Sequence, residues 1–172
     1  MIPVLVAVIA VALDQISKYL VSSSMEPKEV IPVIDWLFEL HYAQNKGASF
    51  GIFADNRLLF MIPSAIAIIA MAAFLTWLII KKKPMFLQIS LALLLAGGVG
   101  NMIDRIRLGY VIDFINPTFV NFAIFNLADS FITIGSVLVV ICLFTKRNGI
   151  NSVSGDKNEE TEETEDKKEK GQ

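Results

Sequence analysis

The 172-residue sequence contains one cysteine and one histidine, and each scarcity excludes a class of protein. A single cysteine, Cys142, cannot form a disulfide within the chain, so a disulfide-stapled fold is excluded. A single histidine, His41, excludes a metal site built from several imidazoles. Charged residues are sparse before residue 148, and no strongly acidic or basic field there suggests nucleic acid as a partner.

Apolar residues are abundant: they make up 54% of the sequence, and the mean hydropathy is +0.58. The acidic residues gather near the end, where residues 148–172 hold eight of the 17 acids and four of the 15 bases. This division predicts two parts. We expect a membrane domain over residues 1–147 and a disordered, acidic tail over residues 148–172 on the cytoplasmic side.

Four apolar stretches are long enough to cross a bilayer as helices, which takes ~20 residues each. They cover about residues 2–21, 58–80, 85–106 and 122–144. The first could instead be a cleaved signal peptide. It lacks a basic start and a good small-residue cleavage site, so a retained helix is favoured.

Lysine and arginine in short loops predict the orientation of these helices. Lys81–Lys83 lies between the second and third stretches, and Lys146 and Arg147 follow the fourth. Both groups belong on the cytoplasmic side, so both termini are expected there. The connections over residues 22–57 and 108–121 are then expected outside.

The first external connection also contains a strand pattern. Phe38, Leu40 and Tyr42 alternate with polar residues, which is typical of a half-buried strand. Gly47 and the apolar residues up to Phe53 suggest a second short strand after a turn. The predicted fold class is therefore an all-α membrane protein with four transmembrane helices and a small extracytoplasmic sheet between helices one and two.

Ionisable residues within the predicted helices cost ~2.5–3.5 kcal/mol each on insertion scales, so each needs a partner or a role. In the predicted topology Asp14, Lys18, Asp104, Arg105 and Asp129 all lie toward the outer ends of their helices. Independent helices would not place costly groups at one depth by chance. A shared site near the outer leaflet is the simplest explanation.

Helical spacing suggests how these groups pair. Asp14 and Lys18 are four residues apart on one face, the spacing of an ion pair. Either they neutralise each other, with Lys18 extending outward to the interface, or they contact a ligand directly. Asn101, Asp104 and Arg105 also share a helix face, and we expect an acid–guanidinium network that ties the third helix to its neighbours.

Two further carboxylates could meet. Asn126 and Asp129 are three residues apart on the fourth helix, and Asp113 lies in the short connection before it. The turn at Asn116 and Pro117 lets the chain fold back. Two close carboxylates cannot both ionise easily, so one keeps a proton while the other acts as a base, as in aspartic proteases. Two unrelated polar positions or a proton-relay pair are the alternatives.

Small residues on the third helix predict close packing beside this site. Ala92, Ala96 and Gly100 recur every four residues and permit a neighbouring helix to approach.

With these residues in place, the chain resembles the lipoprotein signal peptidase family, also called signal peptidase II. The resemblance covers about residues 10–145 and rests on five blocks in the family's order. They are Asp14-Gln15-Ile16-Ser17-Lys18, Asn45-Lys46-Gly47-Ala48-Ser49-Phe50, Gly97-Gly98-Val99-Gly100-Asn101-Met102-Ile103-Asp104-Arg105, Val111-Ile112-Asp113-Phe114 and Phe125-Asn126-Leu127-Ala128-Asp129-Ser130. Each block alone is weak, whereas all five in order are highly specific.

The resemblance implies a bacterial aspartic endopeptidase with four transmembrane helices and an extracytoplasmic β-cradle. Such an enzyme removes signal peptides from prolipoproteins by cutting before a diacylglyceryl-modified cysteine. The family's catalytic pair corresponds to Asp113 and Asp129, and Asn45 and Gly47 would lie close to substrate. The remaining substrate-binding or supporting residues implied are Asp14, Lys18, Asn101, Asp104, Arg105 and Asn126.

The resemblance also implies the surroundings of the enzyme. It would be a multi-pass protein of the bacterial inner or cytoplasmic membrane, with its active site toward the outer leaflet. Its partners would be lipidated prolipoproteins, membrane lipids and globomycin-type inhibitors. No metal or organic cofactor is needed, and nothing demands more than a monomer. A small proton-coupled transporter and a lipid-binding scaffold without activity are the alternatives.

Overall fold

The computed structural model describes residues 1–47 and 57–145. Its elements are α1 (Ile2–Ser24), β1 (Val30–Ile34), β2 (Phe38–Asn45), α2 (Arg57–Ile80), α3 (Met85–Arg107), β3 (Val111–Pro117) and a fourth helix (Leu127–Thr145). All four helices are long and apolar enough to cross a membrane, as the apolar stretches predict.

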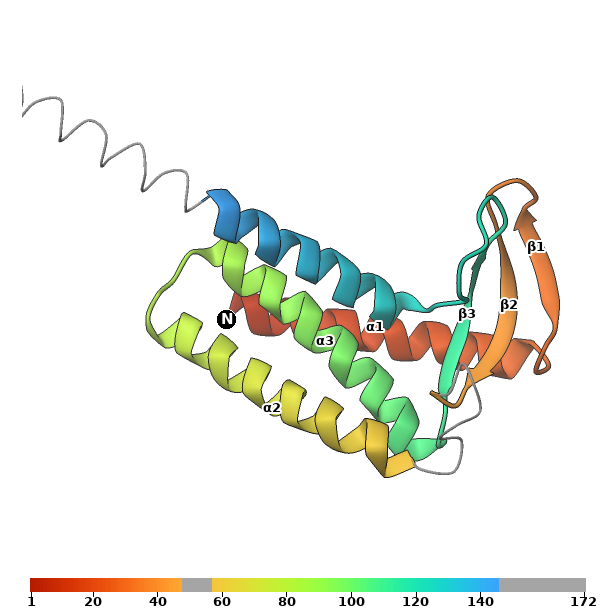
Figure 1. Cartoon of the computed structure of the whole chain (residues 1–172), viewed down its shortest axis with the longest axis horizontal. Coiled ribbons are helices and arrows are strands. Elements are labelled where there is room, and N and C mark those ends of the chain that lie inside the picture. Colours follow the sequence, from red (N-terminus) through yellow and green to blue (C-terminus); the bar gives the residue numbers. More distant parts are fainter. Residues whose placement is uncertain (48–56, 146–172) are drawn as a thin grey trace, which may run out of the picture.

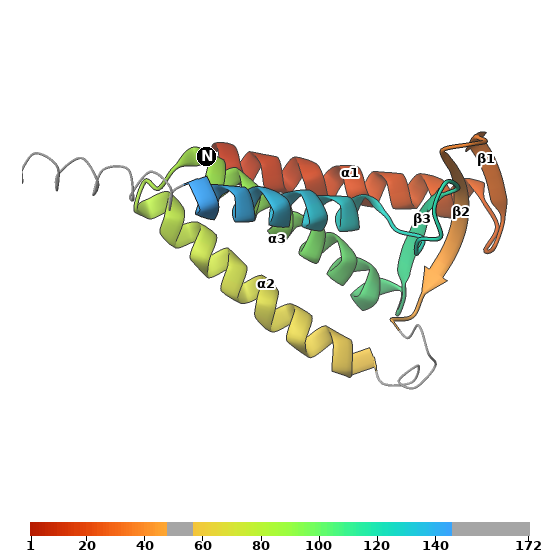
Figure 2. The same ribbon diagram turned by 45° about the horizontal axis from the view of Figure 1, so that its top comes forward.

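The helices run alongside one another, and the sheet crosses one end of them (Figure 1). The N-terminus and the end of the fourth helix lie at the opposite end (Figure 1). In Figure 2, α2 packs beside α3 and diverges from α1 toward the sheet. Half of the apolar window of α3 is buried inside the protein, against 22% or less in the other three helices. The third helix is therefore the centre of the bundle.

Small residues allow this central position. Ala92 and Ala96 are fully buried, and Gly100 faces both α1 and the fourth helix. A Cβ atom at Gly100 would collide with the Asp14 carboxylate and come within 3.3 Å of Ala128. The predicted row of small residues is confirmed, and it brings three helices close together at the level where their polar residues lie.

The sheet is antiparallel with the strand order β1-β2-β3. The predicted strand at Phe38–Tyr42 is confirmed as part of β2, whereas β1 and β3 were not predicted. Most of the second predicted strand falls on residues 48–56, outside the described residues. The third strand comes instead from the connection between α3 and the fourth helix, so the connections before α2 and before the fourth helix both contribute to the sheet.

A small apolar core fastens the sheet to the helices. It contains Val21 and Met25 from the end of α1, Tyr42 from β2, and Ile112 and Phe114 from β3. Asp113 lies between Ile112 and Phe114, and it pairs across the ladder with Ala43 of β2. The packing on both sides fixes the position of its carboxylate.

The fourth helix begins at Leu127, not at about residue 122 as the apolar run suggested. The backbone N–H and C=O groups of Phe125 bond to Ile115 of β3, so Phe125 extends the sheet. Asn126 then caps the helix: its Oδ1 accepts from the Asp129 N–H at 3.0 Å, and the Asp129 Oδ2 accepts from the Asn126 N–H at 3.3 Å. This reciprocal arrangement is a capping box.

Candidate active site

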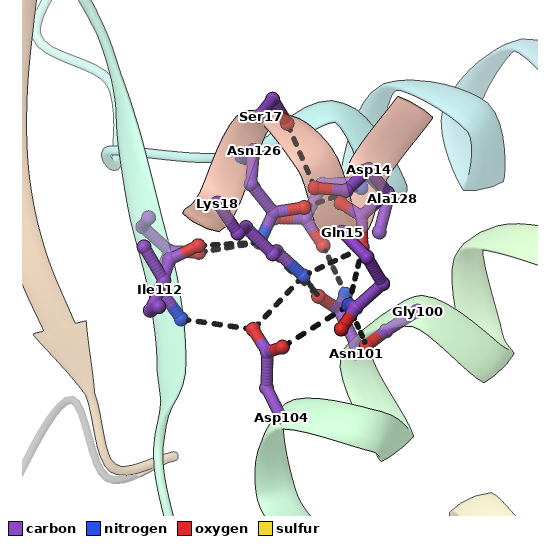
Figure 3. Close-up of polar contacts among 12 residues, drawn as sticks. Asp14, Gln15, Ser17, Lys18, Gly100, Asn101, Asp104, Ile112, Asn126 and Ala128 are labelled. Atoms are coloured by element: carbon purple, nitrogen blue, oxygen red, sulfur yellow. Dashed lines mark hydrogen bonds and ion pairs between the residues drawn. The ribbon is translucent and has the colours of Figure 1, made fainter. Parts of the chain in front are cut away.

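Lys18 lies inside the protein at the level of the small residues, with 2% of its surface exposed. Its Nζ is 2.9 Å from Asp14 Oδ2 and 3.0 Å from Asp104 Oδ2, and it donates to Asn101 Oδ1 at 3.0 Å (Figure 3). An ammonium has three donors, and these three acceptors match them. The interpretation that Lys18 extends outward is therefore wrong, because its counter-ions lie inside the bundle.

The two carboxylates around Lys18 also bind the backbone of other elements. Asp14 Oδ1 accepts from the Ala128 N–H of the fourth helix at 2.9 Å. Asp104 Oδ2 accepts from the Ile112 N–H of β3 at 3.1 Å. Asp14 and Asp104 are almost completely buried. The buried cluster of Asp14, Lys18 and Asp104 thus connects α1, α3, β3 and the fourth helix.

Gln15 belongs to this cluster and was not singled out as a site residue. Its Nε2 donates to Asp14 Oδ2 at 3.1 Å, Asp104 Oδ1 at 3.2 Å and the Gly100 carbonyl at 3.2 Å (Figure 3). The signal available in the sequence was an amide directly after an acid within an apolar span.

Asp104, the acid of the expected network, binds a cation from another helix. The structure places Lys18 of α1 on Asp104. Arg105 donates from Nη1 to the Asn101 backbone carbonyl at 3.5 Å. Helical spacing located the acid correctly, but it carries no information about a cation from another helix.

Asp113 and Asp129 form a second cluster, held by asparagines. Asn126 Nδ2 donates to Asp113 Oδ1 at 2.6 Å, and Asn45 Nδ2 donates to Asp113 Oδ2 at 2.9 Å. Asn101 Nδ2 donates to Asp129 Oδ1 at 2.7 Å. The fourth carboxylate oxygen, Asp129 Oδ2, accepts in the helix cap. Neutral amides therefore orient both carboxylates of this amide-held pair.

The surroundings of Asp113 favour its protonated form. Burial, with the nearby negative charge of Asp129, raises the pKa of Asp113 to about 6, although bonds from Asn45 and Asn126 and the charge of Lys18 oppose the rise. Asp129 is therefore close enough to affect the protonation of Asp113, as the sequence suggested.

Both carboxylates of the pair line one cavity of about 590 Å³ at the sheet end of the bundle. Its other walls come mainly from the segment before the fourth helix and from that helix. The lining residues are Asn45, Asp113, Phe122, Ala123, Ile124, Phe125, Asp129, Ser130, Thr133 and Ile134. The cavity has the size of a ligand site, and it combines apolar walls with two carboxylates.

The position of Asn45 at this cavity depends on Gly47. The Gly47 N–H donates to Asn45 Oδ1 at 2.8 Å, which leaves the Asn45 amide nitrogen for Asp113. Gly47 has a φ of 82°, a conformation that glycine adopts without strain. Among the described residues, no group of three His, Cys, Asp or Glu side chains is arranged to hold a metal ion.

A model of the family described as signal peptidase (SPase) II matches residues 6–145. The chain belongs to the signal peptidase II family. Among its relatives, the lipoprotein signal peptidase of Streptococcus thermophilus (strain CNRZ 1066) is 39% identical over 84% of this chain and 94% of its own length. That of Streptococcus pyogenes serotype M6 (strain MGAS10394) is 41% identical over the same shares.

Solved structures agree with this membership. One structure described as a bacterial membrane enzyme has a TM-score of 0.75 and 35% identity, covering 86% of this chain and 90% of its own. A second has a TM-score of 0.74 and 36% identity, covering 82% and 91%. The chain is thus a multi-pass bacterial membrane protein and a peptidase of the signal peptidase II family.

Proposed function

We propose that this protein is an aspartic endopeptidase that removes signal peptides from diacylglyceryl-modified prolipoproteins, cutting before the lipidated cysteine. The observation that carries the proposal is the amide-held pair: Asp113 and Asp129 line one cavity, and asparagines orient both carboxylates. Membership of the signal peptidase II family supports the substrate class.

The reaction needs only a water molecule and the two carboxyl groups. The ionised aspartate takes a proton from water, and the water oxygen attacks the scissile carbonyl carbon. The protonated aspartate gives its proton to the carbonyl oxygen. In the second step the first aspartate returns its proton to the departing amine nitrogen, the C–N bond breaks, and the hydroxyl proton goes back to the second aspartate. Both carboxyl groups end as they began.

The buried cluster is less suited to this chemistry. Asp14 and Asp104 each contact the Lys18 ammonium and a backbone N–H, and both are almost fully buried. A carboxylate held by a cation in this way is a poor base, and substrate has no access to it. We assign these residues to support of the site.

The position of the cavity suits a lipid-linked substrate. Acyl chains on the cysteine would hold the scissile bond near the membrane surface, with the chains lying between helices. The Lys81–Lys83 turn lies at the end of the bundle away from the sheet (Figure 1), and basic loops favour the cytoplasm. The amide-held pair would then lie toward the outer leaflet, with both termini inside.

Incubation of the purified protein in detergent with a lipidated prolipoprotein tests the proposal. We expect a product whose mass places the diacylglyceryl-cysteine at its new N-terminus, and inhibition by globomycin. The matched control is the same prolipoprotein without the diacylglyceryl group, which should be cut far more slowly. A transporter or a scaffold would leave the lipidated substrate intact. That result, from folded protein, would contradict the proposal.

A further inference from the structure

The two clusters of aspartates are joined through one side chain, that of Asn101. Its Oδ1 accepts from the Lys18 Nζ at 3.0 Å, and its Nδ2 donates to Asp129 Oδ1 at 2.7 Å. Asn101 is 6% exposed, and Figure 3 shows its side chain extending from α3 to Lys18. A single amide therefore separates a buried ammonium from one of the two carboxylates proposed to react.

An amide in this position is polarised by the cation. A cation at the carbonyl oxygen draws electron density from the amide nitrogen, so its N–H becomes a stronger donor. Asn126 Nδ2 donates to the same Asn101 oxygen at 3.1 Å and adds to the effect. The short bond from Asn101 to Asp129 is therefore assisted by the charge of Lys18, although Lys18 and Asp129 lie on opposite sides of the amide.

The second oxygen of Asp129 also has a favourable environment for a negative charge. It accepts from the Asn126 N–H in the first turn of the fourth helix, where the partial positive charge of the helix N-terminus favours an anion. Asp113 lies on β3, and strands have only small net dipoles. The oxygens of Asp113 accept from the amides of Asn126 and Asn45, neither of which receives a bond from an ammonium in the described structure.

We propose that Lys18 is a positioning residue for the chemical step: through the Asn101 amide it strengthens the hydrogen bond to Asp129 and orients that carboxylate at the cavity, so Asp129 takes the first proton from water. Asp113 then supplies the proton to the scissile carbonyl oxygen. This assignment rests on the proposed peptidase function, whose bond changes it leaves as written above, and it adds which carboxylate acts first.

The other charged groups around Asp129 determine how the assignment is tested. They are Asp14 and Lys18 on α1, Asp104 and Arg105 on α3, and Asp113 on β3. Removal of Lys18 would expose Asp129 to the uncompensated charges of Asp14 and Asp104. Removal of Asn101 cuts the connection to Asp129 while both ion pairs of Lys18 remain.

The test is the pH dependence of kcat/KM for wild type, Asn101→Leu and Gln15→Met. Leucine has nearly the shape of asparagine but neither donates nor accepts. Gln15 is the matched control, because its amide bonds to Asp14 and Asp104, the two carboxylates that hold Lys18, but not to Asp129 in the described structure. Thermal unfolding of each variant reports the loss of stability separately.

At low pH kcat/KM falls, and this side of the profile is its acid limb. We expect the acid limb of Asn101→Leu to lie about one pH unit higher than that of wild type, the size of shift that loss of a charge-assisted bond produces. The Gln15→Met profile should keep the wild-type limb, with a lower melting temperature. Lys18→Met should move the limb in the same direction as Asn101→Leu if it folds. If leucine prevents folding, Asn101→Ala removes the same amide without the added bulk.

An unchanged acid limb in Asn101→Leu or Asn101→Ala, with wild type cleaving normally, would overturn the assignment. So would an equal shift in Gln15→Met, because general loosening of the site would then explain both. Failure of the wild type to cleave lipidated substrate would instead contradict the proposed function. The two failures are therefore distinguishable.

Discussion

Two pairs of aspartates adjoin at Asn101, which accepts from Lys18 and donates to Asp129, yet their surroundings differ. Asp14 and Asp104 share a buried ammonium, and backbone N–H groups of other elements complete their bonding. Asp113 and Asp129 accept from uncharged amides and face a cavity. A carboxylate that is bound to a counter-ion and buried away from substrate stabilises the fold. A carboxylate that lines a cavity and is bound by neutral amides is free to exchange a proton.

The comparison also explains why the clusters adjoin. The buried cluster joins α1, α3, β3 and the fourth helix at one level, and these are the elements that supply most of the amide-held pair and its asparagines. Rigid support holds reacting groups in the geometry that the reaction needs. The buried cluster thus holds Asp113 and Asp129, the pair proposed to react, at a fixed distance from each other.

The largest effect is expected from Asp113→Asn and Asp129→Asn. Asparagine resembles a protonated aspartic acid in shape, so packing and many hydrogen bonds should persist, but it cannot exchange the proton. Loss of general acid–base catalysis typically costs ~10²–10⁴-fold, and we expect at least this loss of kcat for each variant. Turnover of a lipidated prolipoprotein measures it. If either folded variant retained most of the wild-type kcat, the aspartic mechanism would be wrong.

Lys18→Met should mainly reduce stability. The substitution keeps the length of the side chain but leaves two buried carboxylates without their cation, and breaking a buried ion pair costs about 3–5 kcal/mol. Unfolding by heat or denaturant in detergent measures the loss of stability. The control is Lys81→Met, an exposed lysine whose replacement should change stability by about 0.5 kcal/mol or less. Equal stability of the two variants would mean that the buried cluster does not hold the helices together.

Gly100→Ala should disturb the buried cluster from another direction. The added methyl group would collide with the Asp14 carboxylate, so we expect a cost of about 1–3 kcal/mol from overpacking. Gly98 on the same helix is the matched control. A methyl group there would lie 3.3 Å from Cγ1 of Ile68, which a shift of a few tenths of an ångström relieves, and alanine favours the helix. If Gly98→Ala were as harmful as Gly100→Ala, contact with Asp14 would not be the cause.

Asp113 should make stability depend on pH. Its pKa is raised from 3.8 to about 6, so between these values the folded protein binds more protons than the unfolded chain. Stability then falls as the pH rises through this window, by on the order of 1–2 kcal/mol after allowance for the open cavity. Asp113→Asn cannot show this loss. As the pH rises from 4.5 to 7.5, the stability of the variant should therefore increase relative to that of wild type. A constant difference in melting temperature at both pH values would contradict the expected pKa.

The smallest effect is expected from deletion of residues 148–172. This acidic segment has no apolar pattern, and in the proposed topology it lies across the membrane from the cavity. The truncated protein should cleave at the wild-type rate in the same detergent assay. An inserted and stable but inactive truncation would give the tail a role in the reaction.

The sequence predicted features that depend on local pattern. Apolar runs located the helices, and the depth of Asp14, Asp104 and Asp129 indicated one shared site. The strand β3 was missed because its first four residues, from Val111 to Phe114, are all buried, so no alternation marks it. The start of the fourth helix was placed too early because the apolar residues up to Phe125 continue the helical run, although they precede the helix and Phe125 pairs with Ile115 of β3.

The surroundings of Lys18 could not be predicted in the same way. A lysine near a helix end usually extends to the interface, and only the acceptors on α3 reverse this preference. Its cross-helix partners arise from tertiary packing, about which a single helix pattern is silent. The same limit applies to Gln15, whose bonds reach Gly100 and Asp104 of α3.

The most direct test of the account compares Asp113→Asn with Asp104→Asn in one assay, with turnover expressed per molecule that binds globomycin. Counting binding-competent protein removes the effect of misfolding, so the ratio reports chemistry alone. We predict that Asp113→Asn binds the inhibitor but loses at least ~10²-fold in turnover per bound site. Asp104→Asn should yield fewer binding sites, each with a turnover near that of wild type. Equal turnover per site in the two variants would contradict the division between supporting and reacting aspartates.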